Sequence, residues 1–500
     1  MIRRLLIANR GEIARRIIHA CREIGIESIA VHSDVDAGAP HVAEADRAIA
    51  IGAAAPADSY LSIPRILDAA VRTGADAVHP GYGVLAENPG LAAACEAGGI
   101  TFVGPPSRVI AAMGSKIAAR QTMAASGVSV VPGETPADQS DDGLCQTIER
   151  IGFPALVKAS AGGGGKGMRR VDRSDAVRPA VQAARREAAT AFGDGTLYVE
   201  RLLERPRHVE VQVFGDRHGH LVHLFERECS TQRRHQKIIE ESPSPALTPA
   251  LRARLAEAGV AAARAAGYVN AGTVEFLLEG EGDRASFYFL EMNTRLQVEH
   301  PVTEAVTGLD LVRAQLLVAS GAPLPWSGSA ITQRGHAVEA RIYAEDPSND
   351  FLPQAGRLLL YREPRGPGIR IDSGVIEGSR VPVHYDPLIA KVIASAESRP
   401  AAIARLVQAL RSFPILGVAT NVPFLLRVLL HPAFEAGAVD TAFLDREMPR
   451  LVAPAAPEPP LHVRAAIAAH LAATGANQPG APAPRRPDRD PWNTIAGWRN

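Results

Sequence analysis

At the start of the chain, short apolar runs alternate with segments whose apolar residues recur every three or four positions. Residues 2–8 form an apolar run, and the following segment places Ala14, Ile17 and Cys21 on one helical face. Residues 26–32 form a second apolar run. The three segments predict a strand, a helix and a strand within about 30 residues, a spacing typical of parallel strands joined by a crossover helix.

The same alternation continues and predicts helices at 63–72 and 90–97 and strands at 75–79 and 100–103. We therefore expect residues 1–113 to form a doubly wound α/β domain around a parallel sheet. This domain lacks the GxGxxG fingerprint of dinucleotide-binding proteins, so its fold gives no reason to expect NAD as a ligand.

From Lys116 onward the pattern becomes one of a helix followed by many strands. The predicted elements are a helix at 117–125, a glycine-rich loop at 162–167, and strands at 155–159, 168–171, 197–200, 208–214 and 221–226. A hairpin then pairs 273–278 with 287–291. Simple alternation along its second strand places Phe287, Phe289 and Glu291 on one face.

The last part of the chain divides into two segments of different composition. Residues 331–446 read as mixed α/β, with the clearest helix at 400–410. Beyond 447 the chain is rich in Pro and Ala around one short helical pattern at 461–472, which is typical of a linker. A chain of 500 residues is long enough for several such domains.

Composition excludes some classes of partner. The chain carries 54 basic and 54 acidic residues, a balance that argues against nucleic-acid binding by phosphate neutralisation and against a basic membrane-surface protein. Its apolar runs are shorter than the ~20 residues needed to span a bilayer. The four cysteines are scattered without a CxxC pair. The predicted first strand begins at Ile2, so we expect no removable leader. We expect a cytoplasmic protein.

Lysine is rare in this chain. Of the 54 basic residues only five are lysines, and the other 49 are arginines. The five are Lys116, Lys158, Lys166, Lys237 and Lys391. None is flanked by methionine, and none follows Lys391.

Three groups of residues are candidates for chemistry. Consecutive glycines at 162–165, with Lys158 and Lys166 on either side, favour contact of the backbone with a polyphosphate, although a flexible hairpin turn would have the same composition. The loop is not a Walker A motif, because Gly167 stands where that motif needs Ser or Thr.

The second group is a set of oxygen ligands on the hairpin. Glu275, Glu291 and Asn293 together suit Mg²⁺ or Mn²⁺, which prefer hard oxygen ligands and phosphate oxygens. An ordinary pair of strand-end acids bonded to arginines explains the residues equally well.

The third group combines the segment RLQVEH at 295–300 with Arg341. Arginine forks bind carboxylate-like or phosphate-like anions, and a neighbouring glutamate can act as a general base. A salt-bridge network on a loop is the alternative. The basic run RRHQK at 233–237 could likewise be a solvated surface segment, with His235 structural.

Several long segments resemble the biotin carboxylases, which are ATP-grasp enzymes. They are IANRGEIA at 7–14, HPGYG at 79–83, FPALVKA at 153–159 with the glycine loop, RECSTQRRHQK at 227–237 and EMNTRLQVEHPVTE at 291–304. The resemblance covers residues 1 to about 446 in the family's order. It implies an N-terminal domain at 1–113, an ATP-grasp domain at 114–330 with a mobile lid at about 131–203, and a C-terminal domain at 331–446.

The resemblance also implies a reaction. The family uses ATP, Mg²⁺ or Mn²⁺ and bicarbonate to form carboxyphosphate and then carboxylates biotin held on a carrier. Lid closure would protect the hydrolysis-prone intermediate from water.

Each matched position takes a role by that resemblance. Lys116 and Lys158 would contact the ATP phosphates, with Gly164 and Gly165 in the lid loop, while Glu200, Arg201 and Leu203 would form the adenine hinge and His208 and His235 would lie on the nucleotide side. Glu275, Glu291 and Asn293 would bind metal, and Lys237, Arg295, Gln297 and Val298 would form the bicarbonate pocket. Glu299 would deprotonate bicarbonate, and Arg341 would steady the ureido oxygen of biotin.

Two other functions are alternatives to this one. Another ATP-grasp ligase, such as a carbamoyl-phosphate synthetase half or a purine-pathway carboxylase, would share the carboxylate hairpin without the combined arginine-rich segments. A non-catalytic nucleotide-binding subunit would lack a catalytic side chain, whereas every matched position here bears a suitable one.

The chain resembles the long α subunits of acetyl-, propionyl- and methylcrotonyl-CoA carboxylases. The segments that carry this resemblance are DPLIAK at 386–391, LGVATN at 416–421, HPAF at 431–434 and DPWNTIAGWRN at 490–500. It implies a biotin carrier and a carboxyltransferase as partners, in a homo- or hetero-oligomer. The acyl-CoA is chosen by the carboxyltransferase and is not encoded in this chain. Whether the chain is a whole subunit is open as well.

Overall fold

The computed structural model describes residues 1–160, 167–452 and 464–469. The chain divides into a unit at Met1–Val452 and a second unit at Ala453–Asn500. Of the second unit, only 464–469 are described, and they are helical within the helix predicted at 461–472. The segment 490–500 lies outside the described residues.

The N-terminal part is built on a five-stranded parallel sheet with the order β3-β2-β1-β4-β5. Its strands are β1 (Arg4–Ile7), β2 (Glu27–Ser33), β3 (Arg47–Gly52), β4 (Ala77–His79) and β5 (Thr101–Phe102). Its helices are α1 (Gly11–Glu23), α2 (Pro40–Glu44), α3 (Ile63–Thr73), α4 (Pro89–Ala97) and α5 (Ser107–Gly114). Leu5 and Ile7 pack in a core with α1, whereas Leu6 packs with α3 and α4, so both sheet faces are covered. The predicted doubly wound domain is confirmed.

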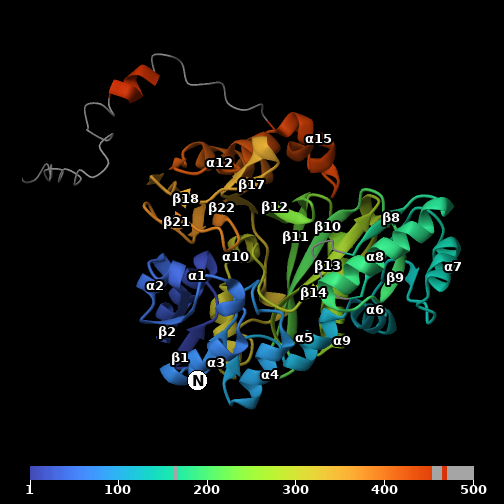
Figure 1. The fold of residues 1–500 in the computed structure, drawn as a ribbon, viewed down its shortest axis with the longest axis horizontal. Helices are drawn as coiled ribbons and strands as arrows, with labels where there is room; N and C mark the ends of the chain where they lie inside the picture. The colour runs from blue at the N-terminus through green and yellow to red at the C-terminus, as the bar shows by residue number, and fades with distance from the viewer. Residues whose placement is uncertain (161–166, 453–463, 470–500) are drawn as a thin grey trace, which may run out of the picture. The chain divides into compact units, whose positions relative to one another are not determined.

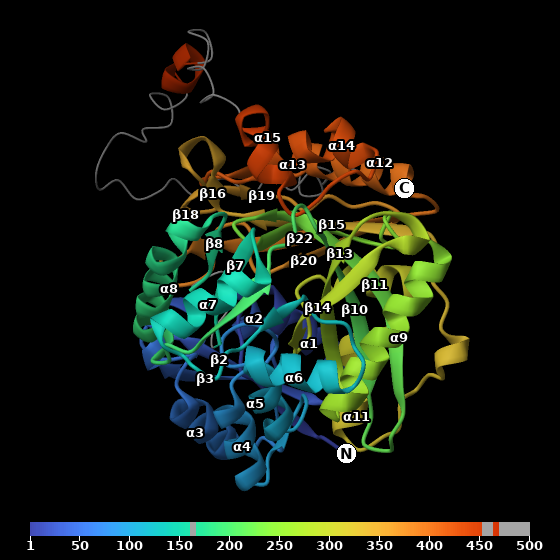
Figure 2. The same cartoon turned by 90° about the vertical axis from the view of Figure 1, so that its right-hand side faces the viewer.

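An eight-stranded sheet forms the centre of the first unit (Figures 1 and 2). Its order is β14-β13-β10-β11-β12-β15-β22-β20. The bounds are β10 (Arg207–Gly215), β11 (Leu221–Arg233), β12 (Gln236–Ser242), β13 (Asn270–Glu279), β14 (Ser286–Asn293), β15 (His336–Tyr343), β20 (Ile369–Ser373) and β22 (Leu388–Ala396). β12 and β15 pair directly, with Ile239 opposite Ala340, so one sheet crosses the boundary predicted at 330.

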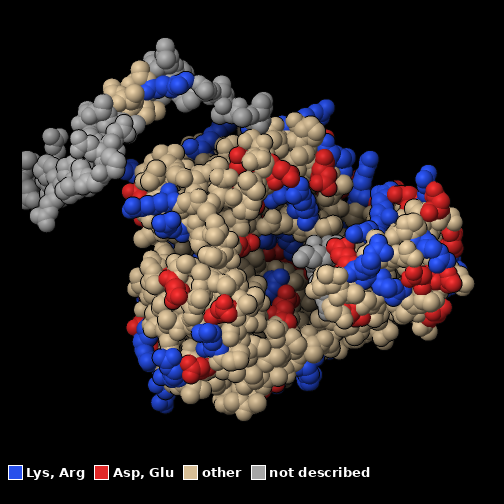
Figure 3. Space-filling view, in the orientation of Figure 1, with Lys and Arg blue, Asp and Glu red and all other residues tan. Residues whose placement is uncertain are grey.

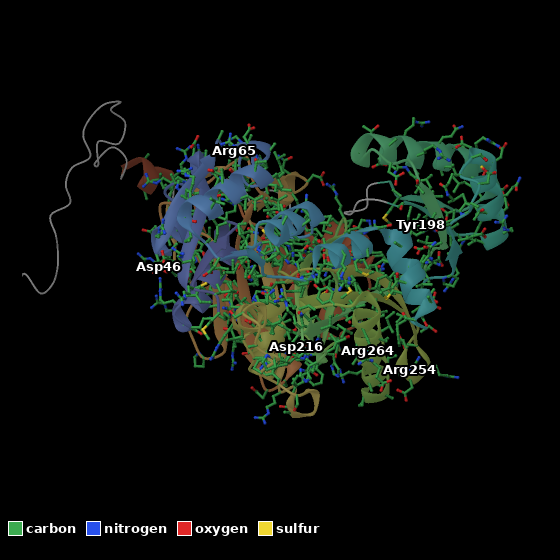
Figure 4. The ribbon with its side chains drawn as sticks, turned by 90° about the horizontal axis from the view of Figure 1, so that it is seen from below. Asp46, Arg65, Tyr198, Asp216, Arg254 and Arg264 are labelled. Atoms are coloured by element: carbon green, nitrogen blue, oxygen red, sulfur yellow. The ribbon has the colours of Figure 1, made fainter. Side chains whose placement is uncertain are left out.

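Helices around this sheet complete the central part. They are α6 (Lys116–Ala125), α9 (Pro249–Ala266), α10 (His300–Thr307) and α11 (Leu311–Ala319). In Figure 4, Arg254 and Arg264 lie on α9, and Asp216 lies beyond the end of β10. α9 contributes Leu251 and Leu255 to the core beneath β10 and β13.

A separate lobe carries the segment predicted as a lid. Its four-stranded sheet has the order β6-β9-β7-β8, from β6 (Gly133–Glu134), β7 (Ala155–Ala159), β8 (Arg169–Val171) and β9 (Leu197–Arg201). Helices α7 (Asp141–Ile151) and α8 (Val177–Phe192) cover it and share its own hydrophobic core. Tyr198 on β9 marks this lobe in Figure 4. The glycines at 162–165, including Gly164 and Gly165, lie outside the described residues.

The C-terminal part packs helices and short strands against β15 and β22. Its helices are α12 (Arg399–Arg411), α13 (Val422–Leu429), α14 (Pro432–Glu435) and α15 (Phe443–Leu451). Three two-stranded sheets join β16 (Glu345–Asp346) to β17 (Leu352–Pro353), β18 (Gly356–Arg357) to β21 (Arg380–Val381), and β19 (Leu360–Tyr361) to β23 (Ile415–Leu416). Because α15 continues to Leu451, the folded unit extends past the boundary predicted at 446.

The predicted alternation along β14 is wrong. Phe276 pairs with Phe289, but Glu275 pairs with Glu291, so a bulge inserts Leu290 between the two pairs. The bulge turns Glu291 to the face occupied by Glu275, while Phe289 stays in the core. Simple alternation would have placed Glu291 beside Phe289.

Within the described residues, every helix is too short or too polar to cross a lipid bilayer.

Candidate active site

A cavity of about 810 Å³ lies between the lobe and the central sheet. In Figure 3 the surface is hollowed between the main body and the lobe, and charged side chains of both signs are visible inside. The predicted residues that line it are Lys116, Lys158, Glu200, Arg201, Leu203, His208, His235, Lys237, Glu275, Glu291, Asn293, Arg295, Gln297, Val298 and Arg341. Glu299 lies directly behind this wall, in contact with Lys237 and Arg341.

Lys237 on β12 contacts three carboxylates. Its Nζ lies 2.5 Å from Glu210, 2.8 Å from Glu275 and 2.6 Å from Glu299. Burial alone would lower the pKa of Lys237, but the three carboxylates raise it well above its usual value. The lysine is therefore a fixed positive charge at neutral pH.

Glu299 immediately precedes α10 and is fully buried. Its Oε1 accepts a hydrogen bond from Lys237, and its Oε2 accepts one from Arg341 at 3.0 Å. Burial raises the pKa of Glu299, but Lys237 and Arg341 more than offset this and hold the pKa well below its usual range. The carboxylate is ionised and oriented by two cations.

Arg341 on β15 also binds Glu240, to which its Nε donates at 2.6 Å. Burial and then the charge of nearby groups, Glu299 among them, raise the pKa of Glu240 to about 7. Arg341 is thus shared between a carboxylate that is ionised and one that titrates near neutrality.

Glu275 and Glu291 face each other across β13 and β14, where the bulge places them on one face. Glu275 is already bonded to Lys237 and to the amide of Asn293. No hydrogen bond or ion pair to the Glu291 carboxylate is present within residues 1–160 and 167–452. Burial and then the charge of Glu275 raise the pKa of Glu291, against the opposing effect of Lys116. These residues fit a divalent metal ion with oxygen ligands.

The segment before Glu299 is tied to the N-terminal domain through Glu87. The backbone N–H of Thr294 and the Nε of Arg295 both donate to Glu87, at 3.0 and 2.9 Å. Arg295 also donates to Gln297 at 2.8 Å and to Asn293 at 3.0 Å. These contacts hold the guanidinium at the cavity wall.

At the lobe end of the cavity, Lys158 on β7 donates to Glu200 on β9 at 2.9 Å. Arg120 donates to the other oxygen of Glu200 at 2.6 Å. Lys116 begins α6, and burial lowers its pKa although Glu291 opposes this. These two lysines place positive charge where the lobe meets the central sheet.

The remaining predicted residues lie around the same end. Arg201 pairs with Glu279 at 2.8 Å, and Leu203 is buried in the wall. His208 lies 3.0 Å from Glu275, whose charge outweighs burial and raises the pKa of the imidazole. His235 is exposed in the turn between β11 and β12, at the cavity rim.

Sequence reasoning missed several residues that hold the site together, namely Glu87, Arg120, Glu210, Arg227 and Glu240. Arg227 is completely buried and donates to Glu210, Gln212, Thr273 and Thr303. The sequence of β10 contains a signal for this buried polar network, because His208, Glu210 and Gln212 alternate with valines. A polar face this regular reads as solvated, whereas here it is buried beneath the cavity.

Three family models match consecutive parts of the chain. They describe the biotin carboxylase N-terminal domain at residues 1–110, the ATP-binding domain of the carbamoyl-phosphate synthase L chain at 115–327, and the biotin carboxylase C-terminal domain at 339–446. The first and third bear the name of the family whose motifs this sequence resembles. The second names the domain that one of the alternative functions would share.

Individual relatives are similar over most of this chain. A biotin carboxylase of Halalkalibacterium halodurans is 48% identical over 448 residues, which are 90% of this chain and 98% of that protein. The mitochondrial methylcrotonoyl-CoA carboxylase subunit alpha of Glycine max is 50% identical over 444 residues, which are 89% of this chain. The match covers 60% of the length of that subunit.

A solved structure has the same fold. The biotin carboxylase domain dimer of Hydrogenobacter thermophilus 2-oxoglutarate carboxylase, in complex with MgADP, ADP and bicarbonate, superposes with a TM-score of 0.87 at 41% identity. The superposition covers 91% of this chain and 100% of that one.

Proposed function

The chain belongs to the biotin carboxylase family, and from that premise we propose that it catalyses the ATP- and bicarbonate-dependent carboxylation of biotin held on a carrier. The observation that carries the proposal is the buried Glu299 carboxylate, fixed between Lys237 and Arg341 at the wall of a cavity rich in cations. The complex of the Hydrogenobacter relative with MgADP and bicarbonate supports the same ligands here.

In this proposal Glu299 accepts the proton of bicarbonate. Its ionised state and its two fixed contacts meet the first requirements of a general base, which are a free lone pair and a defined position. Arg295, Gln297 and Val298 line the wall beside it and orient the anion, while Lys237 holds positive charge next to the reacting oxygens. Bicarbonate then attacks the γ-phosphoryl group of ATP, the bond to the β-phosphate breaks, and carboxyphosphate and ADP are formed.

Arg341 acts in the second step. Carboxyphosphate releases CO₂ and phosphate, the phosphate removes the N1′ proton of biotin, and the deprotonated N1′ then bonds to CO₂. The negative charge that develops on the ureido oxygen needs a neighbouring cation. Arg341 supplies it if its contact with Glu299 loosens as the substrate enters, while Glu240 keeps the guanidinium in the wall.

Glu275, Glu291 and Asn293 are the residues that would hold Mg²⁺ or Mn²⁺. When bound, the metal ion would neutralise the two facing carboxylates and the phosphate oxygens of the nucleotide. Lys116 and Lys158 would bind the phosphates from the lobe side. Gly164 and Gly165, which lie outside the described residues, belong to the lid loop by the resemblance. Glu200, Arg201, Leu203, His208 and His235 would surround the rest of the nucleotide.

The partners that we propose are a biotin carboxyl carrier and a carboxyltransferase, in an assembly of one or more kinds of chain. The similarity to subunit alpha of methylcrotonoyl-CoA carboxylase supports an acyl-CoA carboxylase. The match covers only 60% of that subunit, and the acyl-CoA is left to the partner. A reducing compartment such as the cytoplasm is supported by four cysteines that are all free thiols.

Bicarbonate-dependent ATP hydrolysis in the presence of free biotin tests this function. The expected result is phosphate release that requires both bicarbonate and biotin for its full rate. A rate that responds instead to ammonia would favour the carbamoyl-phosphate synthetase-like alternative. ATP binding without any hydrolysis would favour a non-catalytic subunit.

A further inference from the structure

Lys391 on β22 is a completely buried lysine that does not line the cavity. Its Nζ donates to the backbone carbonyl oxygen of Val298 at 2.7 Å and lies 3.0 Å from Oε1 of Glu12. Asp372 lies further away, at 3.7 Å. The three partners come from the segment that precedes Glu299, from α1 of the N-terminal domain and from β20 of the C-terminal part. One ammonium group therefore joins three parts of the chain.

The strand register places Lys391 directly beside a residue of the proposed active site. It is paired with Arg341 on β15 and with Asp372 on β20, so the two cations project from the same face of the sheet. Arg341 binds the carboxylate of Glu299, and Lys391 binds the carbonyl of Val298. Two neighbouring cations thus hold two consecutive residues of the same segment.

The peptide bond before Val298 is fixed as well. The carbonyl oxygen of Gln297 lies 2.8 Å from Nδ1 of His300, a ring that is itself fully buried. In a trans peptide the N–H points away from the carbonyl, so the contact with His300 sets the direction of the Val298 N–H. The contact with Lys391 sets the direction of the Glu299 N–H in the same way. The two peptide groups on either side of Val298 are therefore oriented by His300 and Lys391, which do not line the cavity.

We propose that Lys391 is a positioning residue for the reaction proposed above, and that it orients the Val298–Glu299 peptide so that the bicarbonate site and its base keep their geometry. The proposal rests on the proposed function. A purely structural role is the competing explanation, because Lys391 also neutralises Glu12 and Asp372. The two roles predict different results when Glu12 is neutralised together with Lys391. A purely structural role predicts that stability and bicarbonate binding recover together, whereas a positioning role predicts that stability alone recovers.

The test compares Lys391→Met with the double variant Glu12→Gln/Lys391→Met. The single change removes a buried cation and leaves Glu12 without it, so lower stability is expected in either case. The double change removes both charges and restores their balance, but it does not restore the hydrogen bond to Val298. Arg399→Met is the matched control, because Arg399 binds Glu241 and two backbone carbonyls away from this segment.

Two quantities are measured for each variant: the KM for bicarbonate and ATP in the hydrolysis assay, and the Kd of bicarbonate by calorimetry with MgADP present. We expect both Lys391 variants to raise the bicarbonate KM about tenfold or more and to weaken its binding similarly, with the ATP KM within about twofold of the parent. The double variant should recover its melting temperature without recovering bicarbonate binding. Arg399→Met should lose stability alone.

Three results would overturn the proposal: an unchanged bicarbonate KM in Lys391→Met, recovery of bicarbonate binding together with stability in the double variant, or a double variant that unfolds as readily as the single one. Failure of the proposed function gives a different pattern. The parent would then bind bicarbonate without hydrolysing ATP, and the calorimetric comparison would still decide the role of Lys391.

Discussion

The Nζ atom of Lys237 lies 2.6 Å from Oε1 of Glu299, and neither side chain has more than slight access to solvent. A buried ion pair of this kind fixes the position of the carboxylate and keeps it ionised. The proposed base is therefore ready before substrate arrives. We expect one of these contacts to loosen when bicarbonate binds, which would couple entry of the anion to release of the base.

Replacing Glu299 with Gln should remove the proton acceptor while keeping the side-chain shape. We expect bicarbonate-dependent ATP hydrolysis to fall by about 10²- to 10⁴-fold, the usual contribution of a general base. Phosphate release at saturating ATP and bicarbonate measures this. Glu228→Gln is the control, because it removes another buried carboxylate that contacts Ser230 and Ser244 outside the cavity. Equal loss in both variants would contradict a specific role for Glu299.

Replacing Glu291 with Gln should have opposite effects with and without metal. Because burial and Glu275 raise the pKa of Glu291, its charge destabilises the metal-free protein at neutral pH. We expect the variant to melt at a higher temperature than the parent in EDTA. With Mg²⁺ and ADP the parent should gain stability and the variant should gain much less. A variant that responds to Mg²⁺ as the parent does would rule Glu291 out as a ligand.

Glu240 should make stability depend on pH in a defined direction. Its pKa rises from 4.5 to about 7 in the folded protein through burial and nearby charge, against the opposing effect of Arg341. A raised pKa contributes stability below the unfolded value, and that contribution is lost as pH rises through the folded value, by up to about 1.4 kcal/mol per pH unit. Urea unfolding between about pH 5 and pH 8 should therefore show a smaller decline in Glu240→Gln. Parallel curves for parent and variant would refute the assignment.

Asp216, which follows the end of β10 (Figure 4) and does not line the cavity, should show the opposite dependence. Backbone N–H groups of His218, His220 and Leu324 donate to its carboxylate. Burial opposes ionisation, but these bonds and the contact with the His220 ring prevail and lower the pKa to about 2. The stabilisation is present above the unfolded value near 3.8 and is lost as pH falls toward about 2.

Asp216→Asn should lower the free energy of unfolding by about 1–3 kcal/mol at neutral pH, because an amide cannot satisfy all of these donors. The difference from the parent should shrink as pH falls below about 4. The bicarbonate KM should stay unchanged. A constant difference across this range would show that the carboxylate charge is not the cause.

Much of the fold follows from local patterns. The periodicity of α1 and the runs of β1 and β2 lie in adjacent sequence, so they identify the parallel domain without tertiary information. The strand β3 (Arg47–Gly52) escaped prediction because only Ile51 along it is buried, which leaves no clear apolar run.

The arrangement of the site residues could not be predicted from local sequence patterns. The face of Glu291 depends on the bulge at Leu290, which inserts one residue and has no marker such as glycine in the sequence. The partners of Lys237 and Arg341 are the buried glutamates Glu210 and Glu240. Glu210 alternates with valines as on a solvated strand face, and Glu240 follows two isoleucines in a segment with no clear alternation. Family resemblance supplied the candidate residues, whereas the charge pairing among them depends on contacts between strands distant in sequence.

The pairing of β12 with β15 has a consequence for engineering. Lys237 and Arg341 belong to segments that a domain-shuffling design would exchange separately, yet Glu240 and Glu339 are register partners across that junction. A chimaera joined near residue 330 would take β12 from one parent and β15 from the other. The side chains that face each other across this strand pair would then come from different proteins and would have to be made compatible. Recombination points placed before β10 or after α15 would keep β12 and β15 from the same parent.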